Sequence, residues 1–162
     1  MNDTEYKRMY HRLYRLFRRV TPLKKDCGVL CSRACCQGDD RTGMLLFPHE
    51  ETDLQVIEKN GLRYAVCQGV CRREDRPLSC RIFPFFPAVD ENGRVYAVID
   101  ERGRFVCPLV RQCDHVKFRP AFLRRVKKAG SLLAKDQECL VFLRTISGEI
   151  AETSALADQL KN

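Results

Sequence analysis

Apolar side chains recur at helical spacing near both ends of the chain. At the N-terminus they predict an amphipathic helix over residues 3–20, with Asp3 or Thr4 as the cap and Thr21-Pro22 as the end. Its apolar positions are Met9, Tyr10, Leu13, Leu16, Phe17 and Val20. Towards the C-terminus the pattern predicts one helix over residues 120–134 and a second over 137–157, interrupted near Gly148.

The middle of the chain favours short strands. Residues 44–47 and 62–67 are strand-like, and residues 88–89 and 94–99 predict a hairpin with Asn92-Gly93 at its turn. Between the first two strands we expect a helix over residues 48–60, with Pro48 at its first position and Asn60-Gly61 at its end. Glu50 and Glu51 would then lie in the first helical turn.

A proline-rich and aromatic stretch covers residues 76–87. Its three prolines argue against a regular helix, so we expect a rigid, buried loop or an edge strand. Residues 104–109 then begin a turn or helix that runs towards Cys113 and His115. The predicted fold class is α+β: a small, cysteine-rich, mostly helical domain with a short β-hairpin, organised around a cysteine metal site. We expect a single domain over residues 1–162, comprising a metal-binding module over about 23–118 and a helical part over 119–162.

Ten of the 162 residues are cysteines, and the compartment decides how they are interpreted. The first ten residues are polar, without the apolar core of a secretory signal, and no apolar run is long enough for a membrane span. We therefore expect a cytoplasmic protein that does not enter a membrane. In a reducing cytosol, clustered cysteines bind metal or do redox chemistry more often than they form disulfides.

The net charge is +8 and the sequence pI is about 9.1. A basic domain suits nucleic acid, an acidic partner or an anionic membrane surface. Ionisation of eight cysteines would bring the protein charge to about zero, so the charge supports nucleic-acid binding only weakly. The N-terminal helix and the Arg124-Arg125 and Lys127-Lys128 pairs are the candidate basic elements; a packed helix with a solvated face is the favoured interpretation of the N-terminal one.

The cysteines fall into three groups, which begin with a C-x3-C-x3-C-C cluster. At helical pitch its first three thiols would share one face. The adjacent thiols of the doublet cannot share a face, which favours a site surrounded by several segments of the chain. The candidate metal ligands are Cys27, Cys31, Cys35, Cys36, Cys67, Cys71, Cys80, Cys107 and Cys113. His115 is a further candidate, whereas Cys139 lies among apolar residues and is assigned to the core.

The doublet together with Arg76-Pro77-x-x-Cys80-Arg81-x-Phe83-Pro84 resembles the family of zinc- or iron-chelating proteins named for its C-x2-C-x2-C-C signature. The resemblance covers residues 27–113, and the spacings here are x3 and x3. It implies a cysteine-ligated metal site with Cys35, Cys36 and Cys80 as ligands, joined by Cys27, Cys71 and Cys107. Some relatives look like flagellin lysine methylases, but this chain has no glycine-rich cofactor motif, so methyl transfer is not carried over.

Two arginines and three phenylalanines complete the predicted site. Arg76 and Arg81 would offset thiolate charge and donate hydrogen bonds to sulfur, or else flank a proline loop as surface charges. Phe83, Phe85 and Phe86 would shield the site from water, pack in the core, or do both.

Several functions follow from these features. The first is a metal-binding protein holding zinc or an iron–sulfur cluster, with no biological role assigned. The second is an enzyme that uses the metal or cluster for group transfer or redox chemistry, and the third is a basic nucleic-acid-binding module. A disulfide-bonded or partner-binding domain is a further alternative. Whether the protein is an enzyme and what its partners are stay open at this point.

Overall fold

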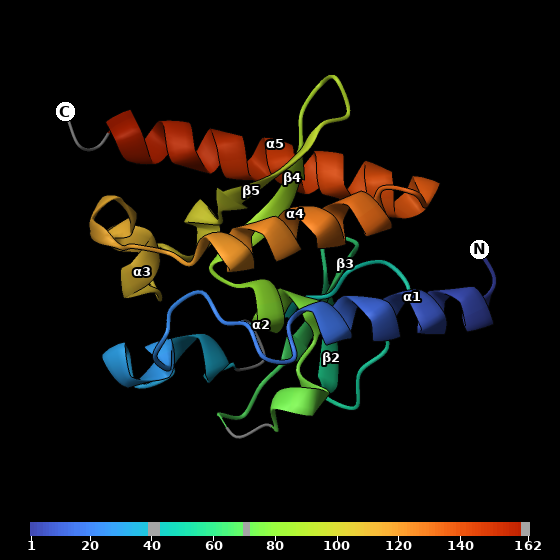
Figure 1. Cartoon of the computed structure of the whole chain (residues 1–162), viewed down its shortest axis with the longest axis horizontal. Coiled ribbons are helices and arrows are strands. Elements are labelled where there is room, and N and C mark those ends of the chain that lie inside the picture. The colour runs from blue at the N-terminus through green and yellow to red at the C-terminus, as the bar shows by residue number, and fades with distance from the viewer. Residues whose placement is uncertain (39–42, 70–71, 160–162) are drawn as a thin grey trace.

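Helices cover two small antiparallel sheets in the computed structural model, which describes residues 1–38, 43–69 and 72–159 (Figure 1). The helices are α1 (Asp3–Leu16), α2 (Leu78–Ile82), α3 (Pro108–Arg111), α4 (Pro120–Leu133) and α5 (Gln137–Gln159). The strands are β1 (Met44–Leu45), β2 (Gln55–Lys59), β3 (Leu62–Val66), β4 (Phe85–Val89) and β5 (Val95–Ile99). Short 3₁₀ turns are η1 (Cys27–Leu30), η2 (Ala34–Cys36), η3 (Arg73–Asp75), η4 (Glu101–Gly103) and η5 (Cys113–His115). The predicted mixture of helix and sheet is confirmed.

The first sheet has the strand order β1-β3-β2, and it overturns one prediction. Residues 48–60 do not form a helix, because β2 pairs with β3 in a tight antiparallel hairpin, Gln55 opposite Val66. Its turn is Asn60-Gly61, with φ of 52° and 73°. Two successive residues at positive φ make the turn that matches the twist of paired strands, which explains why Asn-Gly serves here as a hairpin turn rather than as a helix end.

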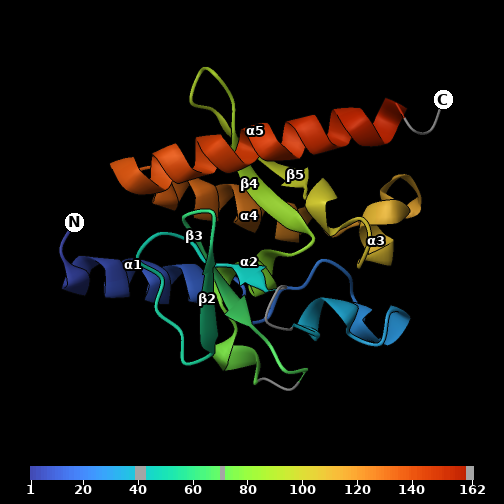
Figure 2. The same ribbon diagram turned by 180° about the vertical axis from the view of Figure 1, so that it is seen from behind.

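The second sheet is the predicted hairpin of β4 and β5. Phe85 lies opposite Ile99, and the Asp90 carboxylate accepts hydrogen bonds from the backbone N–H groups of Asn92 and Arg94 across the turn. Both C-terminal helices pack against β4, and α4 also packs against β5. Figure 2 shows the long α5 lying across this hairpin.

The N-terminal helix is shorter than predicted. The Asn2 side chain caps it by accepting from the Glu5 N–H, and the Glu5 carboxylate accepts from the Asn2 N–H in return. It ends at Leu16 instead of residue 20. Side chains from elsewhere take up the carbonyls that follow, since Arg125 donates to Leu16 O and Arg73 donates to Phe17 O.

A short helix interrupts the proline-rich stretch, where we expected none. Helix α2 occupies residues 78–82, between Pro77 and Pro84, so neither proline lies inside it. The expectation of an edge strand is met just afterwards, because Pro87 lies in β4 of the two-stranded hairpin. The aromatic residues Phe85 and Phe86 are buried.

One buried carboxylate joins three segments around α2. Glu50 is fully buried. Its Oε1 accepts from the Leu78 N–H at 2.6 Å and the Tyr14 hydroxyl at 2.8 Å, and its Oε2 accepts from the Phe47 N–H at 3.1 Å. Burial raises the pKa of Glu50, while the hydrogen bond from Leu78 opposes the rise. Glu50, which we expected in the first turn of a helix over residues 48–60, instead accepts from the N-terminus of α2.

The larger of two described apolar clusters runs from α1 to α5. It includes Leu13, Phe47, Phe86, Val126 and Leu143, so residues from both the predicted module and the predicted helical part contribute to it. Cys139 belongs to the same cluster and is fully buried, which confirms its assignment to the core. Helix α5 continues through Gly148 without the predicted interruption. A side chain at that position would meet nothing within 4 Å.

None of the described helices is long and apolar enough to cross a membrane.

Replacement of Glu50 by alanine should lower the free energy of unfolding by about 3 kcal/mol, since it leaves two buried N–H groups and a hydroxyl without their acceptor. The neighbouring Glu51 is exposed and pairs with an exposed lysine, Lys7. Glu51→Ala should therefore change stability by less than about 0.5 kcal/mol. Urea denaturation followed by circular dichroism gives both values, and equal losses in the two variants would refute the structural role of Glu50.

Candidate functional site

The first cysteine group lies in a curled loop instead of on a helix. The Asp26 carboxylate caps η1 by accepting from the Gly28 N–H. Ser32 and Arg33 then adopt left-handed conformations, with φ of 49° and 58°, and η2 follows. Two left-handed residues in succession end any regular α-helix. Cys27, Cys31 and Cys35 therefore do not share the single face that helical pitch would give them, because each turn of the loop redirects the chain.

The cysteine doublet meets the end of β3. Gly38 N–H donates to Cys67 O at 2.7 Å, and Gln37 forms an isolated bridge with Gln68. These backbone contacts bring the Cys36 and Cys67 thiols within hydrogen-bonding distance of each other. The Sγ atoms of Cys35 and Cys36 are 4.0 Å apart. The structure therefore brings together three predicted ligands from two of the predicted segments.

Two further thiols of the loop approach the third cysteine group. Cys107 lies close enough to Cys27 for its charge to raise the Cys27 pKa, and Cys31 raises the pKa of Cys107 in the same way. Cys107 is buried at the start of α3, in a small apolar cluster with Leu109 that Cys27 also contacts. Burial raises the pKa of both thiols. Cys27, Cys31 and Cys107 thus form a second, more apolar group beside the doublet. Charges on Cys31 and Cys27 also raise the pKa of Cys35 in the doublet.

The electrostatic environment divides the doublet into an acidic and a weakly acidic thiol. The hydrogen bond between the doublet thiols, assisted by the positive charge of Arg76, lowers the pKa of Cys36 to about 6. The same hydrogen bond and burial raise the pKa of Cys35. Arg33 also lowers the pKa of Cys36. Arg76 thus acts on a thiol of the doublet, as predicted.

Arg81 has a different position from the one we expected. It is buried on α2, 4.3 Å from the centre of the Tyr14 ring. Its guanidinium donates to Arg76 O and Glu74 O, each at 2.6 Å. Arg81 therefore fixes the backbone of the loop that carries Arg76. The charge of the nearby Cys80 raises the pKa of Arg81, against the lowering by burial.

The remaining described candidates lie on α2 and η5. Cys80 is on α2, where its charge also acts on Tyr14. Cys113 is beside Asp114, and the exposed His115 follows on the same 3₁₀ turn, η5. Cys71 lies outside the described residues. Across residues 1–38, 43–69 and 72–159, no three His, Cys, Asp or Glu side chains converge closely enough to hold a metal ion.

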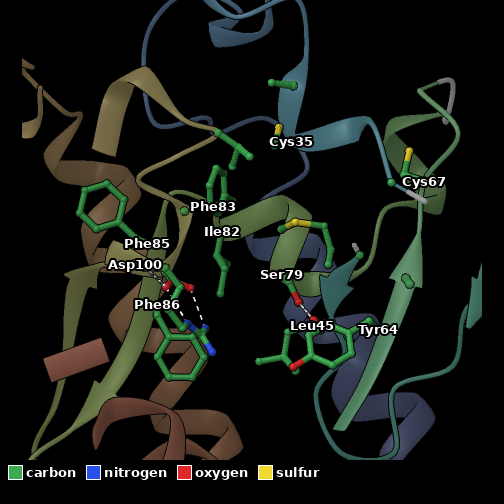
Figure 3. A pocket seen from close by; sticks show the side chains of 18 of the residues that line it. Cys35, Leu45, Tyr64, Cys67, Ser79, Ile82, Phe83, Phe85, Phe86 and Asp100 are labelled. Carbon is green, nitrogen blue, oxygen red and sulfur yellow. Dashed lines mark hydrogen bonds and ion pairs between the residues drawn. The ribbon is translucent and has the colours of Figure 1, made fainter. Parts of the chain in front are cut away.

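A cavity of about 370 Å³ adjoins the doublet (Figure 3). Cys35 and Cys67 lie at one end, and the walls are largely apolar, including Leu45, Phe83 and Phe86. The predicted shielding phenylalanines thus line this cavity. Its size falls at the lower end of the range typical of small-ligand pockets.

The far wall of the cavity contains charged residues that sequence reasoning did not identify. Arg102 pairs with Asp100 at 2.8 Å and with Glu149 at 3.2 Å, and all three line the cavity. They come from the end of the β4–β5 hairpin and from the middle of α5. No motif links positions so far apart in sequence, so only the packing of α5 on the hairpin brings them together.

Protein-family models, curated proteins and solved structures were all compared with the chain, and none of them matches. The resemblance to the chelating family accordingly depends on the motif residues alone.

In metal-free protein, alkylation of Cys36 by iodoacetamide should rise with pH through a midpoint near 6, because the thiolate is the reactive form and this pKa is lowered. Cys139, which is buried and has its pKa raised to about 12, should stay unmodified until the protein unfolds. Peptide mass spectrometry of time points at each pH measures both rates.

Cys35→Ala removes one of the two thiols that hydrogen-bond to Cys36 and should move the Cys36 midpoint upwards. A midpoint near 8.5 in the unsubstituted protein, the ordinary value for a free cysteine, would contradict the proposed environment.

Proposed function

We propose that this protein binds a metal ion or an iron–sulfur cluster through thiolates centred on Cys35, Cys36 and Cys67. The observation that carries the proposal is the meeting of the doublet with the end of β3. These thiols come from segments more than thirty residues apart in sequence, and backbone hydrogen bonds hold the segments together. Preorganised ligands lose less conformational entropy when they bind a metal.

The donor set suits a thiophilic metal. Two sulfurs bound to one tetrahedral zinc ion at about 2.3 Å each lie about 3.8 Å apart. The doublet sulfurs are 4.0 Å apart, so a small side-chain adjustment would suffice. Zinc and iron–sulfur clusters both take thiolate ligands, and their site would be completed by other candidates, among which Cys31, Cys27 and Cys107 are adjacent.

The charge around the doublet also favours thiolate ligands. Metal ligation requires deprotonated sulfur, and Cys36 has the lowered pKa that makes deprotonation easy near neutral pH. Arg76 and Arg33 offset part of the negative charge that several thiolates would accumulate. These residues would hold and balance the metal; the metal itself would stabilise the loop or supply Lewis-acid or electron-transfer chemistry.

A second candidate function is a metal- or cluster-dependent enzyme, and the cavity favours it. Cys35 and Cys67 are proposed ligands and also line the cavity, so a small molecule bound there would lie beside the metal. The Asp100–Arg102–Glu149 set at the far wall would orient a polar group of that molecule.

Cys36→Ser and Cys67→Ser should each reduce the metal-to-protein ratio by at least about tenfold, since a hydroxyl is a poor substitute for a thiolate ligand. Cys139→Ser is the matched control, because its thiol is in the core and away from the doublet. Elemental analysis of anaerobically prepared protein, with a visible spectrum, gives the ratio and separates colourless zinc from a brown cluster. Metal-free wild-type protein, or equal loss in all three variants, would exclude the proposal.

The enzyme candidate predicts an accessible coordination position. Imidazole, a small neutral ligand that fits the cavity, should shift the visible absorption bands of cobalt(II)-loaded protein. Met44 lines the cavity, so Met44→Trp should abolish the shift, whereas Val141→Trp on the exposed side of α5 should leave it unchanged. Unperturbed bands in the unsubstituted protein would indicate a closed, structural site.

A further inference from the structure

The positive charge of the protein is concentrated in two segments. Residues 6–25 and 115–135 contain fifteen of the 29 lysines and arginines and none of the 21 acidic residues. The rest of the chain has fourteen basic against 21 acidic residues, so its charge is negative. The thiol loop after Asp26 belongs to this negative part. The net positive charge therefore does not lie in the segments that contain the cysteines and cannot balance them there.

The fold places the two basic segments against each other. Helix α1 lies in the first and α4 in the second, and the two helices pack together. The Phe17 and Phe122 rings meet edge to face with centres 5.7 Å apart, and Arg125 of α4 donates to Leu16 O at the end of α1. Figures 1 and 2 show both helices on the same side of the molecule.

A groove of about 480 Å³ lies between these helices. Four cationic side chains line it, and Leu16 and Leu132 supply its apolar part. The four cations are Arg12, Arg15, Arg125 and Lys128. Within the described part of the chain, none of the four forms an ion pair with an acidic side chain. Four like charges at one groove repel one another, and an anion with several negative charges would relieve that repulsion.

A second cleft extends the basic surface across α1. It has a volume of about 660 Å³ and shares Arg15 with the groove. Arg18 and Arg73 also line it, with Glu74 as its one acidic residue among those described. The cationic surface is therefore longer than a single phosphate group requires and suits a chain of phosphates.

We propose that the groove between α1 and α4 binds the phosphate backbone of a nucleic acid. Arginine is suited to this role because its planar guanidinium donates two parallel hydrogen bonds to phosphate oxygens. The described residues that line the groove include no aromatic side chain on which a base could stack, so its contacts would be to the backbone. Binding through the backbone alone is insensitive to sequence and strongly dependent on salt.

An anionic membrane is the competing partner for a basic helix. A helix that lies in a membrane interface must bury an exposed apolar face in the lipid. The apolar face of α1, with Tyr6, Met9, Tyr10 and Leu13, is already buried in the protein core. Lipid insertion would therefore require the helix to leave the fold, and the groove favours nucleic acid.

The test measures binding of a fluorescein-labelled 20-nucleotide single-stranded RNA by anisotropy between 50 and 300 mM KCl, with a duplex DNA of equal length in parallel. The variant is Arg12→Ala with Lys128→Ala, both exposed groove residues whose loss should not unfold the protein. We expect affinity at 100 mM KCl to fall about tenfold. The slope of log K against log salt should decrease in magnitude by about 1.4 for the single strand, or 0.7 per phosphate contact.

Lys59→Ala with Arg94→Ala is the matched control, because it removes the same charge from exposed positions of β2 and the β4–β5 turn. Its affinity should stay within twofold of wild type. Equal losses in both pairs would mean that net charge alone attracts the RNA, which overturns the proposal. So would absence of binding to both nucleic acids at 50 mM KCl, or retention on phosphatidylserine vesicles by a protein that binds neither nucleic acid.

Discussion

The arrangement of this fold depends on a carboxylate buried where α1, the end of β1 and the start of α2 meet. Glu50 accepts hydrogen bonds from Tyr14, Phe47 and Leu78, one from each of these segments. Its burial is costly, as the raised pKa indicates, and three donors together offset that cost. Because Leu78 begins α2, the position of that short helix is set by a residue twenty-eight positions earlier in the chain.

Helix α2 in turn positions the residues around the thiols. Arg81, held on the helix beside the Tyr14 ring, donates to the carbonyls of Glu74 and Arg76. The backbone around Arg76 is thereby fixed, and the charge of Arg76 acts on Cys36. A continuous set of contacts thus links the buried carboxylate to the proposed metal ligands. The loop over residues 74–76 gains a defined position from these contacts.

Sequence predicted the elements whose signals are local. The β4–β5 hairpin follows from Asn92-Gly93 between apolar runs, and α4 and the burial of Cys139 follow from helical spacing. Residues 48–60 were misassigned because Asn60-Gly61 ends a helix and turns a hairpin equally well. The choice is decided by the pairing of β2 with β3, which is not local. The contact of Cys36 with Cys67 and the Asp100–Arg102–Glu149 set are also tertiary, so no spacing in the chain could reveal them.

The distribution of charge connects the two proposals. Outside residues 6–25 and 115–135 the chain already has more acidic than basic residues before any cysteine ionises. Several thiolates would deepen this excess, and the described arginines that lower the Cys36 pKa, Arg33 and Arg76, offset only part of it. A bound cation would supply the remaining balance at the doublet. The groove between α1 and α4 has an excess of the opposite sign, since its four cations lack acidic partners among the described residues. The proposed metal at the thiols and the proposed polyanion at the helices therefore share one basis, the segregation of charge along the chain.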